Sequence, residues 1–501
     1  REPDVYNELY KPNNLDDGDA DDIHRYNNWY APSSFITDAK FEKEAKINGG
    51  KRPFIGQEMS TGYPDLDDGL PVFRYTRDLL TPQAWIGNLA YRGNDPKFFL
   101  DHYRAVTKRW AERLRYERGD RTAGFMLFAT ECWFSHSYDA KTVKPYSVLE
   151  AVREAYSPVG VALETGRRRF FMGEQIDTAV FITNDDENQK DYSDLRIEIN
   201  FVDRKSGKKI SVNEIGKLPK LAFYETARVP VKIKFPSETS RRELSLQLRL
   251  LDGEKEISRS TDYVEILPSA QKTKIEAPVF TRNMGPELGR FLKTTTQFSA
   301  EAEPANAKVI LLGLRDDLVG LEKAGDLRTV IERGATAIIF SPGEKFTKLF
   351  PNEILDVKNA PGEFADFSPC AGTKLAENLA PMDLKWWGRK DDARVFVANA
   401  SHRLQTNSTA RELIRFIPAH GYIPEEKVKE QYRTVLFEIP LGKGRLWVCD
   451  LDLEASVLVD PSAQQFAVNL FRAAADPNST TKLPKVPTHE ELLKRKNRVE
   501  N

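Results

Sequence analysis

The apolar residues recur with different periods in three stretches of the chain. Between residues 1 and 155, the short apolar runs RPFIG (52–56) and GFMLFA (124–129) predict strands. The segment between them, 96–116, repeats its apolar residues every three or four positions, which predicts an amphipathic helix. A strand, a helix and a strand in this order predict a βαβ unit and a parallel sheet. DDIHRYNNWY (21–30) predicts one more strand.

Residues 156–270 change to a period of two. Runs such as LRIEINFVD and ELSLQLRLLD alternate apolar and polar positions, and turn-forming stretches such as NDDENQ and RKSGKK lie between the runs. Short alternating strands joined by polar turns predict an antiparallel β-sandwich. Residues 271–305, rich in Thr, Pro, Ala and Glu, are predicted to be a linker.

Residues 306–475 return to strands that alternate with helices. AKVILLG (307–313) and ATAIIFS (335–341) are continuous apolar runs, typical of strands buried on both faces. Helical segments follow, including SAQQFAVNLFRAAA near the end. The pattern predicts an open, doubly wound α/β sheet. Residues 476–501 are predicted to be a polar C-terminal tail.

The composition of the chain excludes several classes of function. The net charge is −1, so no basic field exists to hold nucleic acid, and no apolar run reaches the ~18 residues that a membrane span needs. Cys132, Cys370 and Cys449 are too widely spaced for a zinc site or a disulfide framework, so we expect buried free thiols. No metal-ligand set and no phosphate-binding glycine motif is visible, and we expect no cofactor.

Four motifs follow one another in an order that is informative only when they are taken together. KRPFIGQEMSTG (51–62) ends a predicted strand with Glu58, and DDIHRYNNWY contains His24, Tyr26 and Trp29. GFMLFATECWFSHSY (124–138) places Trp133 after another strand, and KPYSVLEAVREAYSPVGVAL (144–163) leads into the sandwich. This succession resembles glycoside hydrolase family 2, although Ser60 stands where that family has a glycine.

The resemblance implies a retaining β-glycosidase with three domains. Residues 1–155 would be the C-terminal half of a (β/α)8 TIM barrel, and 156–270 an immunoglobulin-like β-sandwich. Glu58 would be the catalytic nucleophile. Trp133, Tyr26, His24 and Trp29 would contact the carbohydrate substrate. The sugar stays open among β-galactoside, β-mannoside and β-glucuronide, as does a homo-oligomeric state. The family's habits suggest a periplasmic or secreted enzyme.

The second catalytic carboxyl group has no clear counterpart in the chain. In the family the acid/base follows an asparagine at the end of an earlier strand, and Asn7-Glu8 has no buried strand before it. We therefore expect the acid/base to lie upstream of Arg1. A (β/α)8 barrel takes ~250 residues, so the missing half of the barrel would come from upstream residues or from another chain. The alternative is a noncatalytic carbohydrate-binding or assembly protein that retains the fold.

The last domain, 306–475, resembles the class I glutamine-amidotransferase fold in a noncatalytic form. GKGRLWVCDLDLE (442–454) carries that likeness. A working amidotransferase needs a cysteine on a sharp strand-to-helix turn with a histidine partner. Cys370 follows a proline with no buried strand before it, and Cys449 is inside a strand. We therefore expect a structural domain, and a weaker alternative is an amidohydrolase.

Overall fold

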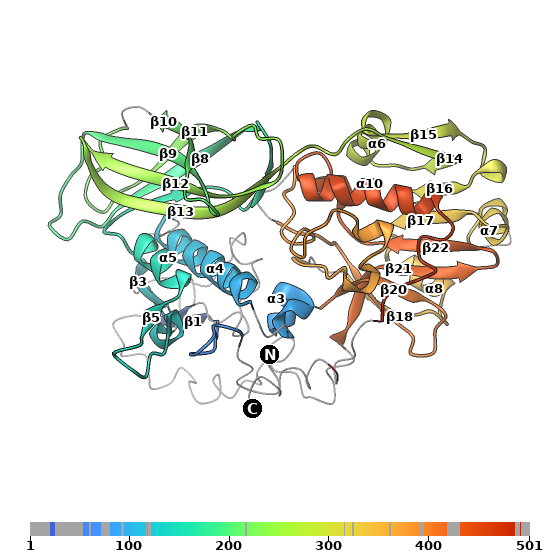
Figure 1. Cartoon of the computed structure of the whole chain (residues 1–501), viewed down its shortest axis with the longest axis horizontal. Helices are drawn as coiled ribbons and strands as arrows, with labels where there is room; N and C mark the ends of the chain where they lie inside the picture. Colours follow the sequence, from blue (N-terminus) through green and yellow to red (C-terminus); the bar gives the residue numbers. More distant parts are fainter. Residues whose placement is uncertain are drawn as a thin grey trace.

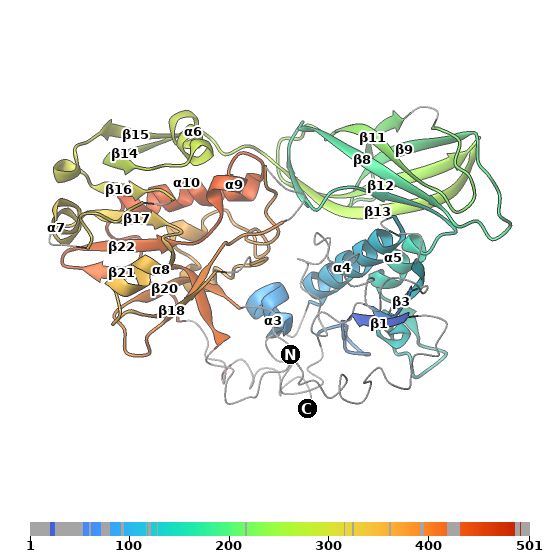
Figure 2. The same cartoon turned by 180° about the vertical axis from the view of Figure 1, so that it is seen from behind.

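In a computed structural model the chain forms three packed units, which Figures 1 and 2 show from opposite sides. The first unit contains α3, α4 and α5, the second is a β-sandwich above it, and the third is a large sheet covered by helices. The structure describes residues 21–25, 54–59, 62–71, 81–91, 95–116, 118, 122–127, 129–215, 218–314, 316–322, 325–359, 362–390, 395–417, 431–485 and 491.

The first unit is built on a parallel sheet with the strand order β1-β2-β3. Its strands are β1 (Asp21–Arg25), β2 (Phe54–Met59) and β3 (Thr122–Leu127). The 20-residue helix α4 (Lys97–Tyr116) connects β2 to β3, as the sequence periodicity predicts. Other elements of this unit are α3 (Thr81–Ile86), η4 (Gly87–Tyr91), η5 (Thr130–Trp133), β4 (Phe134–Ser135), β5 (Lys144–Pro145) and α5 (Ser147–Ala155).

The second unit consists of two sheets that share one apolar core. The larger sheet has the order β10-β9-β12-β13-β7 and the smaller β11-β8-β6. Alternate residues point inward, as in β12, where Leu244, Leu246 and Leu248 are fully buried. The strands are β6 (Val159–Leu163), β7 (Arg169–Phe171), β8 (Gln175–Asn184), β9 (Leu195–Asp203), β10 (Lys209–Ile215), β11 (Thr226–Lys234), β12 (Arg242–Asp252) and β13 (Lys255–Leu267).

The third unit is a mixed sheet with the order β15-β14-β16-β17-β22-β21-β19-β18, to which β20 adds beside β21. The first five strands are mutually parallel, and the rest are antiparallel. Seven strands of this sheet are β16 (Val309–Leu312), β17 (Thr336–Phe340), β18 (Ile354–Lys358), β19 (Ser401–Leu404), β20 (Arg411–Phe416), β21 (Arg433–Leu441) and β22 (Gly444–Cys449). The other two, β14 and β15, are described below.

Helices cover both faces of this sheet, which explains its continuous apolar runs. In β16, Val309 and Leu311 join the core beneath α10, whereas Ile310 and Leu312 join the core beneath α7 and α8. The helices are α6 (Pro286–Thr294), α7 (Asp326–Glu332), α8 (Gly343–Leu349), α9 (Leu453–Ser456) and α10 (Pro461–Ala475).

The linker predicted for residues 271–305 is wrong. This segment forms β14 (Thr273–Arg282), α6 and β15 (Thr296–Glu301), which extend the sheet of the third unit at one edge. Its composition is typical of a linker, but the proline is tolerated because the pairing of β14 with β15 shifts register between Ile275 and Pro278, and a residue without an N–H fits such an irregular position. Pro278 lies within β14, next to the buried Ala277 and Val279. The predicted tail also begins too early, since Thr480 is buried and donates a hydrogen bond to Glu438.

The polar face of α4 is buried against the sandwich. Asp262 on β13 receives Lys108 Nζ at 3.3 Å and Arg109 Nη2 at 3.1 Å, and all three side chains are at most 4% exposed. Arg168 adds a third cation at 3.2 Å from the same carboxylate. Burial alone would raise the pKa of Asp262, but the surrounding cations, Arg109 first, lower it. The first two units are therefore joined by charges that are almost completely shielded from water.

We predict that Asp262→Asn lowers the free energy of unfolding by about 3 kcal/mol, because it leaves buried cations without their shared anion. Urea unfolding followed by tryptophan fluorescence measures this change. The matched control is Asp177→Asn, whose pair with Lys232 spans 3.6 Å between side chains that are 78% and 73% exposed. That control should change stability by no more than about 0.5 kcal/mol. Equal effects of the two variants would contradict a structural role for the Asp262 network.

Candidate functional site

The carboxyl edge of the parallel sheet brings two of the predicted site residues together. His24 and Glu58 are register partners on the neighbouring strands β1 and β2, and each is the penultimate residue of its strand. The register shifts between Ile23 and His24, so the pairing changes at this position. The carboxyl ends of parallel strands are where substrate sites of barrel enzymes form.

Trp133 lies at the same edge of the sheet, because it follows β3, the neighbour of β2. Its side chain is half-buried and packs against the core of the first unit, so one part of the indole remains open to solvent. Two other predicted contacts, Tyr26 and Trp29, lie outside the described residues. The structure therefore brings His24, Glu58 and Trp133 to one edge.

The loops that follow β2 and β3 meet in a single rim. The His136 amide donates to the Leu66 carbonyl at 2.5 Å, and the Tyr146 hydroxyl donates to the Asp65 carbonyl at 2.5 Å. The Tyr146 amide in turn donates to the Trp133 carbonyl at 2.8 Å. Tyr146 therefore connects the backbone of Trp133 to the loop that follows β2.

The turn at Asp65, Asp67 and Asp68 resembles a calcium loop only superficially. Asp65 Oδ1 accepts a hydrogen bond from the Asp67 amide at 2.8 Å, and Asp68 Oδ1 accepts one from the Leu70 amide at 2.8 Å. Gly69 takes the left-handed conformation, with φ of +77°, that closes this turn. The carboxylates of Asp65 and Asp68 thus hold the backbone of the turn.

The third unit contacts the long connection between Glu58 and α4. The Tyr432 hydroxyl donates to Gln83 Oε1 at 3.1 Å, and the Asn88 amide donates to Asp366 Oδ2 at 3.3 Å. Gly87 has φ of +60°, and a Cβ there would lie 2.9 Å from the Asp366 carboxylate. In both overall views α3 lies between the first and third units. The third unit thus fixes the segment that follows the strand of Glu58.

A tryptophan of the third unit completes the core of the first. Trp386 is 8% exposed, and its ring stacks on His102 of α4 at 5.0 Å between centroids. His102 in turn lies 3.9 Å from the ring of Trp85 in α3. Trp386 has φ of +53°, a conformation that costs a bulky residue energy and persists only where packing enforces it.

Lys385, the neighbour of Trp386, is buried without a hydrogen bond to its ammonium group among the described residues. The side chain lies against rings, with Nζ 4.3 Å from the centroid of Trp386 and 5.6 Å from that of Phe364. Burial lowers the pKa of Lys385 to about 7, although the negative charge of Glu363 acts to raise it. Burial, and then the charge of Lys385, lowers the pKa of His102 well below its ordinary value. Both groups favour their neutral forms at this junction.

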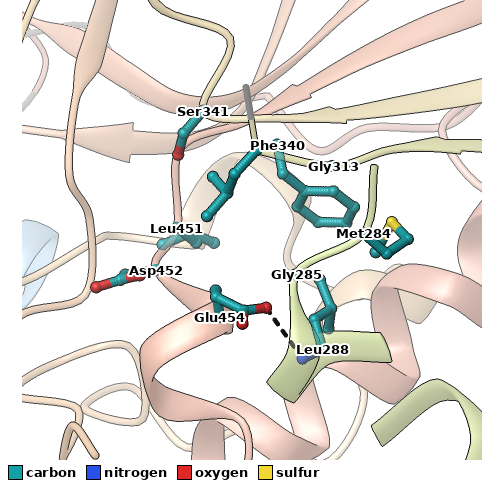
Figure 3. Close-up of a pocket in the computed structure, with 10 residues that line it drawn as sticks. Met284, Gly285, Leu288, Gly313, Phe340, Ser341, Leu451, Asp452 and Glu454 are labelled. Atoms are coloured by element: carbon teal, nitrogen blue, oxygen red, sulfur yellow. Dashed lines mark hydrogen bonds between the residues drawn. The ribbon is translucent and has the colours of Figure 1, made fainter. Parts of the chain in front are cut away.

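A second candidate site lies at the carboxyl edge of the third sheet, where the ends of β16 and β17 face α6 and α9 (Figure 3). Ser341 occupies the turn from strand to helix with φ of +44°, the strained geometry in which many hydrolases hold a nucleophile. The pocket beside it has a free volume of about 10 Å³, about what one water molecule needs. Glu454 fills its floor by accepting hydrogen bonds from the amides of Glu287 and Leu288.

The Ser341 turn lacks the groups that a nucleophile needs. The next residue is Pro342, which has no N–H to stabilise an oxyanion. Asp450 lies near this turn, because the Ser341 amide donates to the Cys449 carbonyl at 2.9 Å, but the histidine that pairs with it, His402, is on β19, with Nδ1 2.7 Å from Asp450 Oδ2. Three strand spacings separate β17 from β19, or about 14 Å. The described residues therefore give Ser341 no histidine base.

The three cysteines are free and buried, as expected from the sequence. Burial raises the pKa of Cys370 to about 12 and also raises that of Cys449, so neither is a ready thiolate. Among the described residues, no group of three or more His, Cys, Asp or Glu side chains is placed to hold a metal ion. None of the described helices is both long and apolar enough to span a bilayer.

No protein-family model matches the chain, and no curated protein matches it. Among solved structures it is similar to the exo-chitosanase CsxA of Amycolatopsis orientalis, with 13% identity over 36% of this chain and 21% of that one, at a TM-score of 0.25. The β-D-mannosidase of Dictyoglomus thermophilum shares 14% identity over 53% and 33% of the two chains, at 0.28. The sporulation control protein Spo0M of Bacillus subtilis shares 18% over 22% and 48%, at 0.16.

Glycosidases are thus among the structures that this chain is similar to. The chain spans less than half of each of these three proteins.

We predict that stability rises between pH 7 and pH 10 because of Lys385. Its pKa is lowered to about 7 in the folded protein, whereas an exposed lysine has a pKa of about 10.4. Across that window the unfolded chain binds the extra proton, so raising the pH favours the folded state. Urea midpoints measured at pH 7, 8, 9 and 10 test this slope.

Lys385→Met should raise the urea midpoint at pH 7 and flatten its rise with pH, because methionine fills the same space without a charge. Lys443→Met, at a solvent-exposed turn, is the control and should leave the slope as it is. An unchanged slope in Lys385→Met would contradict the assignment.

Proposed function

We propose that the protein is a retaining β-glycosidase of the family 2 type, with Glu58 as its nucleophile. The observation that carries the proposal is the position of Glu58 at the carboxyl end of a parallel strand, in register with His24. Trp133 at the end of the neighbouring strand supports it. The order of motifs around these residues is the second support.

The same proposal extends to the domains. Residues 1–155 would be part of a (β/α)8 barrel completed by upstream residues or another chain, and 156–270 an immunoglobulin-like sandwich. Residues from 271 onward would form a noncatalytic amidotransferase-like domain. The absence of a base beside Ser341 among the described residues supports the noncatalytic assignment.

The proposed reaction is a double displacement. The Glu58 carboxylate attacks the anomeric carbon while an acid/base, expected upstream of Arg1, protonates the leaving oxygen, so the glycosidic bond breaks as the glycosyl-enzyme ester forms. Water, deprotonated by the same acid/base, then attacks the anomeric carbon and releases Glu58 as a carboxylate. His24 would contact a sugar hydroxyl, and Trp133 would lie under the apolar face of the ring.

The competing function is a noncatalytic carbohydrate-binding or assembly protein. The serine at position 60, where the resembled family has glycine, is the observation that favours it. Such a protein would bind a sugar without forming a covalent intermediate.

We predict that a 2-deoxy-2-fluoro-β-glycosyl fluoride labels the peptide that contains Glu58. Fluoride leaves without acid catalysis, so the reagent needs a folded pocket and the nucleophile only. Reagents of galacto, manno, gluco and glucurono configuration are incubated with the protein at its natural length, and peptide mapping locates the label. No label from any of them on folded protein would favour the noncatalytic function.

Glu58→Ala should lower turnover of the matching 4-nitrophenyl β-glycoside by about three orders of magnitude or more. Added azide should restore turnover and give the α-glycosyl azide, because it replaces the missing carboxylate at the same face of the sugar. Glu131→Ala, an exposed carboxylate beside Trp133, is the control and should keep most of the activity. A Glu58→Ala variant that is as active as the wild type would exclude Glu58 as the nucleophile.

A further inference from the structure

An exposed tyrosine stands on the rim formed by the loops after β2 and β3. Tyr138 is 67% exposed, the largest exposed fraction of the big apolar side chains in the described part of the chain. Both loops start from the carboxyl ends of neighbouring parallel strands, so Tyr138 belongs to the same edge of the molecule as Glu58 and Trp133. Sequence reasoning missed this residue because its signal lies in a contact between two loops.

The ring of Tyr138 is held in place although it is open to solvent. Its hydroxyl donates to Asp67 Oδ1 at 2.5 Å, so a residue of one loop anchors a residue of the other. His136 supports the same corner, with its ring 5.9 Å from that of Tyr138 and its Nε2 3.8 Å from Asp67 Oδ1. An aromatic ring fixed before binding loses little conformational freedom when a ligand covers it.

The backbone beneath the ring is equally constrained. His136 has φ of +50°, a left-handed conformation that is uncommon for residues other than glycine, although histidine adopts it more readily than most. Asp139 closes the loop by accepting hydrogen bonds from the Lys141 amide at 2.9 Å and the Thr142 hydroxyl at 3.0 Å. The loop that carries Tyr138 is therefore held in place by its own hydrogen bonds, and we call it, with the Tyr138 ring, the platform.

We propose that Tyr138, with Asp67 and His136, forms a subsite for the leaving-group side of a β-linked oligosaccharide. The proposal rests on the proposed glycosidase function. The flat ring would cover the C–H face of a sugar unit beyond the cleaved bond. The free oxygen of Asp67 and the His136 ring would meet the hydroxyl groups at its edge. The occupant is a further sugar of the same chain, because the platform lies on the edge where the reacting unit would be bound.

The chain length of the substrate tests the subsite. We compare a 4-nitrophenyl β-glycoside with a trisaccharide that ends in the same sugar, using the protein at its natural length. Tyr138→Ala should lower kcat/KM for the trisaccharide about tenfold, mainly through KM, while the aryl glycoside changes less than about twofold. Tyr138→Trp should retain most of the trisaccharide activity, because it keeps a flat ring, with a loss of no more than about threefold because the hydroxyl that binds Asp67 is gone. Asp67→Ala should give an intermediate loss of about threefold, because the ring loses its anchor.

The matched control is Tyr224→Ala, which removes another exposed tyrosine, 53% exposed, from a loop of the sandwich. It should leave both substrates unaffected. Equal losses for both substrates in Tyr138→Ala, or no loss for either, would overturn the subsite.

A wild-type protein that cleaves neither substrate would overturn the proposed function without deciding the subsite. In that case calorimetric titration of the trisaccharide into wild type and Tyr138→Ala decides whether Tyr138 forms a carbohydrate-binding subsite. Binding that weakens about tenfold in the variant supports the platform, and equal binding or no binding by the wild type overturns it.

Discussion

The arrangement of the first two units depends on charges buried between α4 and the sandwich. Asp262 holds two cations of α4 and Arg168 of the sandwich in a region almost without water, where an unpaired charge is costly. Because these charges satisfy one another only in one relative position, they favour a single orientation of the first unit against the second. The buried charges on α4 therefore also determine how the sheet edge with His24, Glu58 and Trp133 is oriented relative to the sandwich.

A second constraint joins the third unit to the other two. The segment 382–388 contacts the sandwich through Arg169, which donates to the Lys385 carbonyl at 2.6 Å, and through Arg241, which binds Asp383 with two hydrogen bonds of 2.8 Å. The same segment inserts Trp386 beside His102. The third unit is therefore part of the structural support of the first unit, because without it the core around Trp85 would be incomplete.

The sequence predicts elements well where burial follows a simple period. The runs of β16 and β17, the apolar stripe of α4 and the alternation in β12 all appear where expected. Sequence patterns do not reveal the burial of a residue whose partner is far away in the chain. The polar face of α4 gives no sign that Lys108 is buried, because its partner Asp262 lies 154 residues away. The same limit applies to the site: strand ends indicate Glu58 and Trp133, whereas the anchoring of Tyr138 by Asp67 depends on two loops 71 residues apart.

The insertion of Trp386 has a consequence for folding during synthesis on the ribosome. Trp386 is made 284 residues after His102, the ring on which it stacks. At about 5–20 residues per second, translation needs roughly 15–60 s to cover that distance. During this time α3 and α4 are already synthesised but lack the indole that closes their packing. The nascent first unit therefore exposes apolar surface around His102 and Trp85 until the last third of the chain emerges. Chaperones bind apolar surface of this kind.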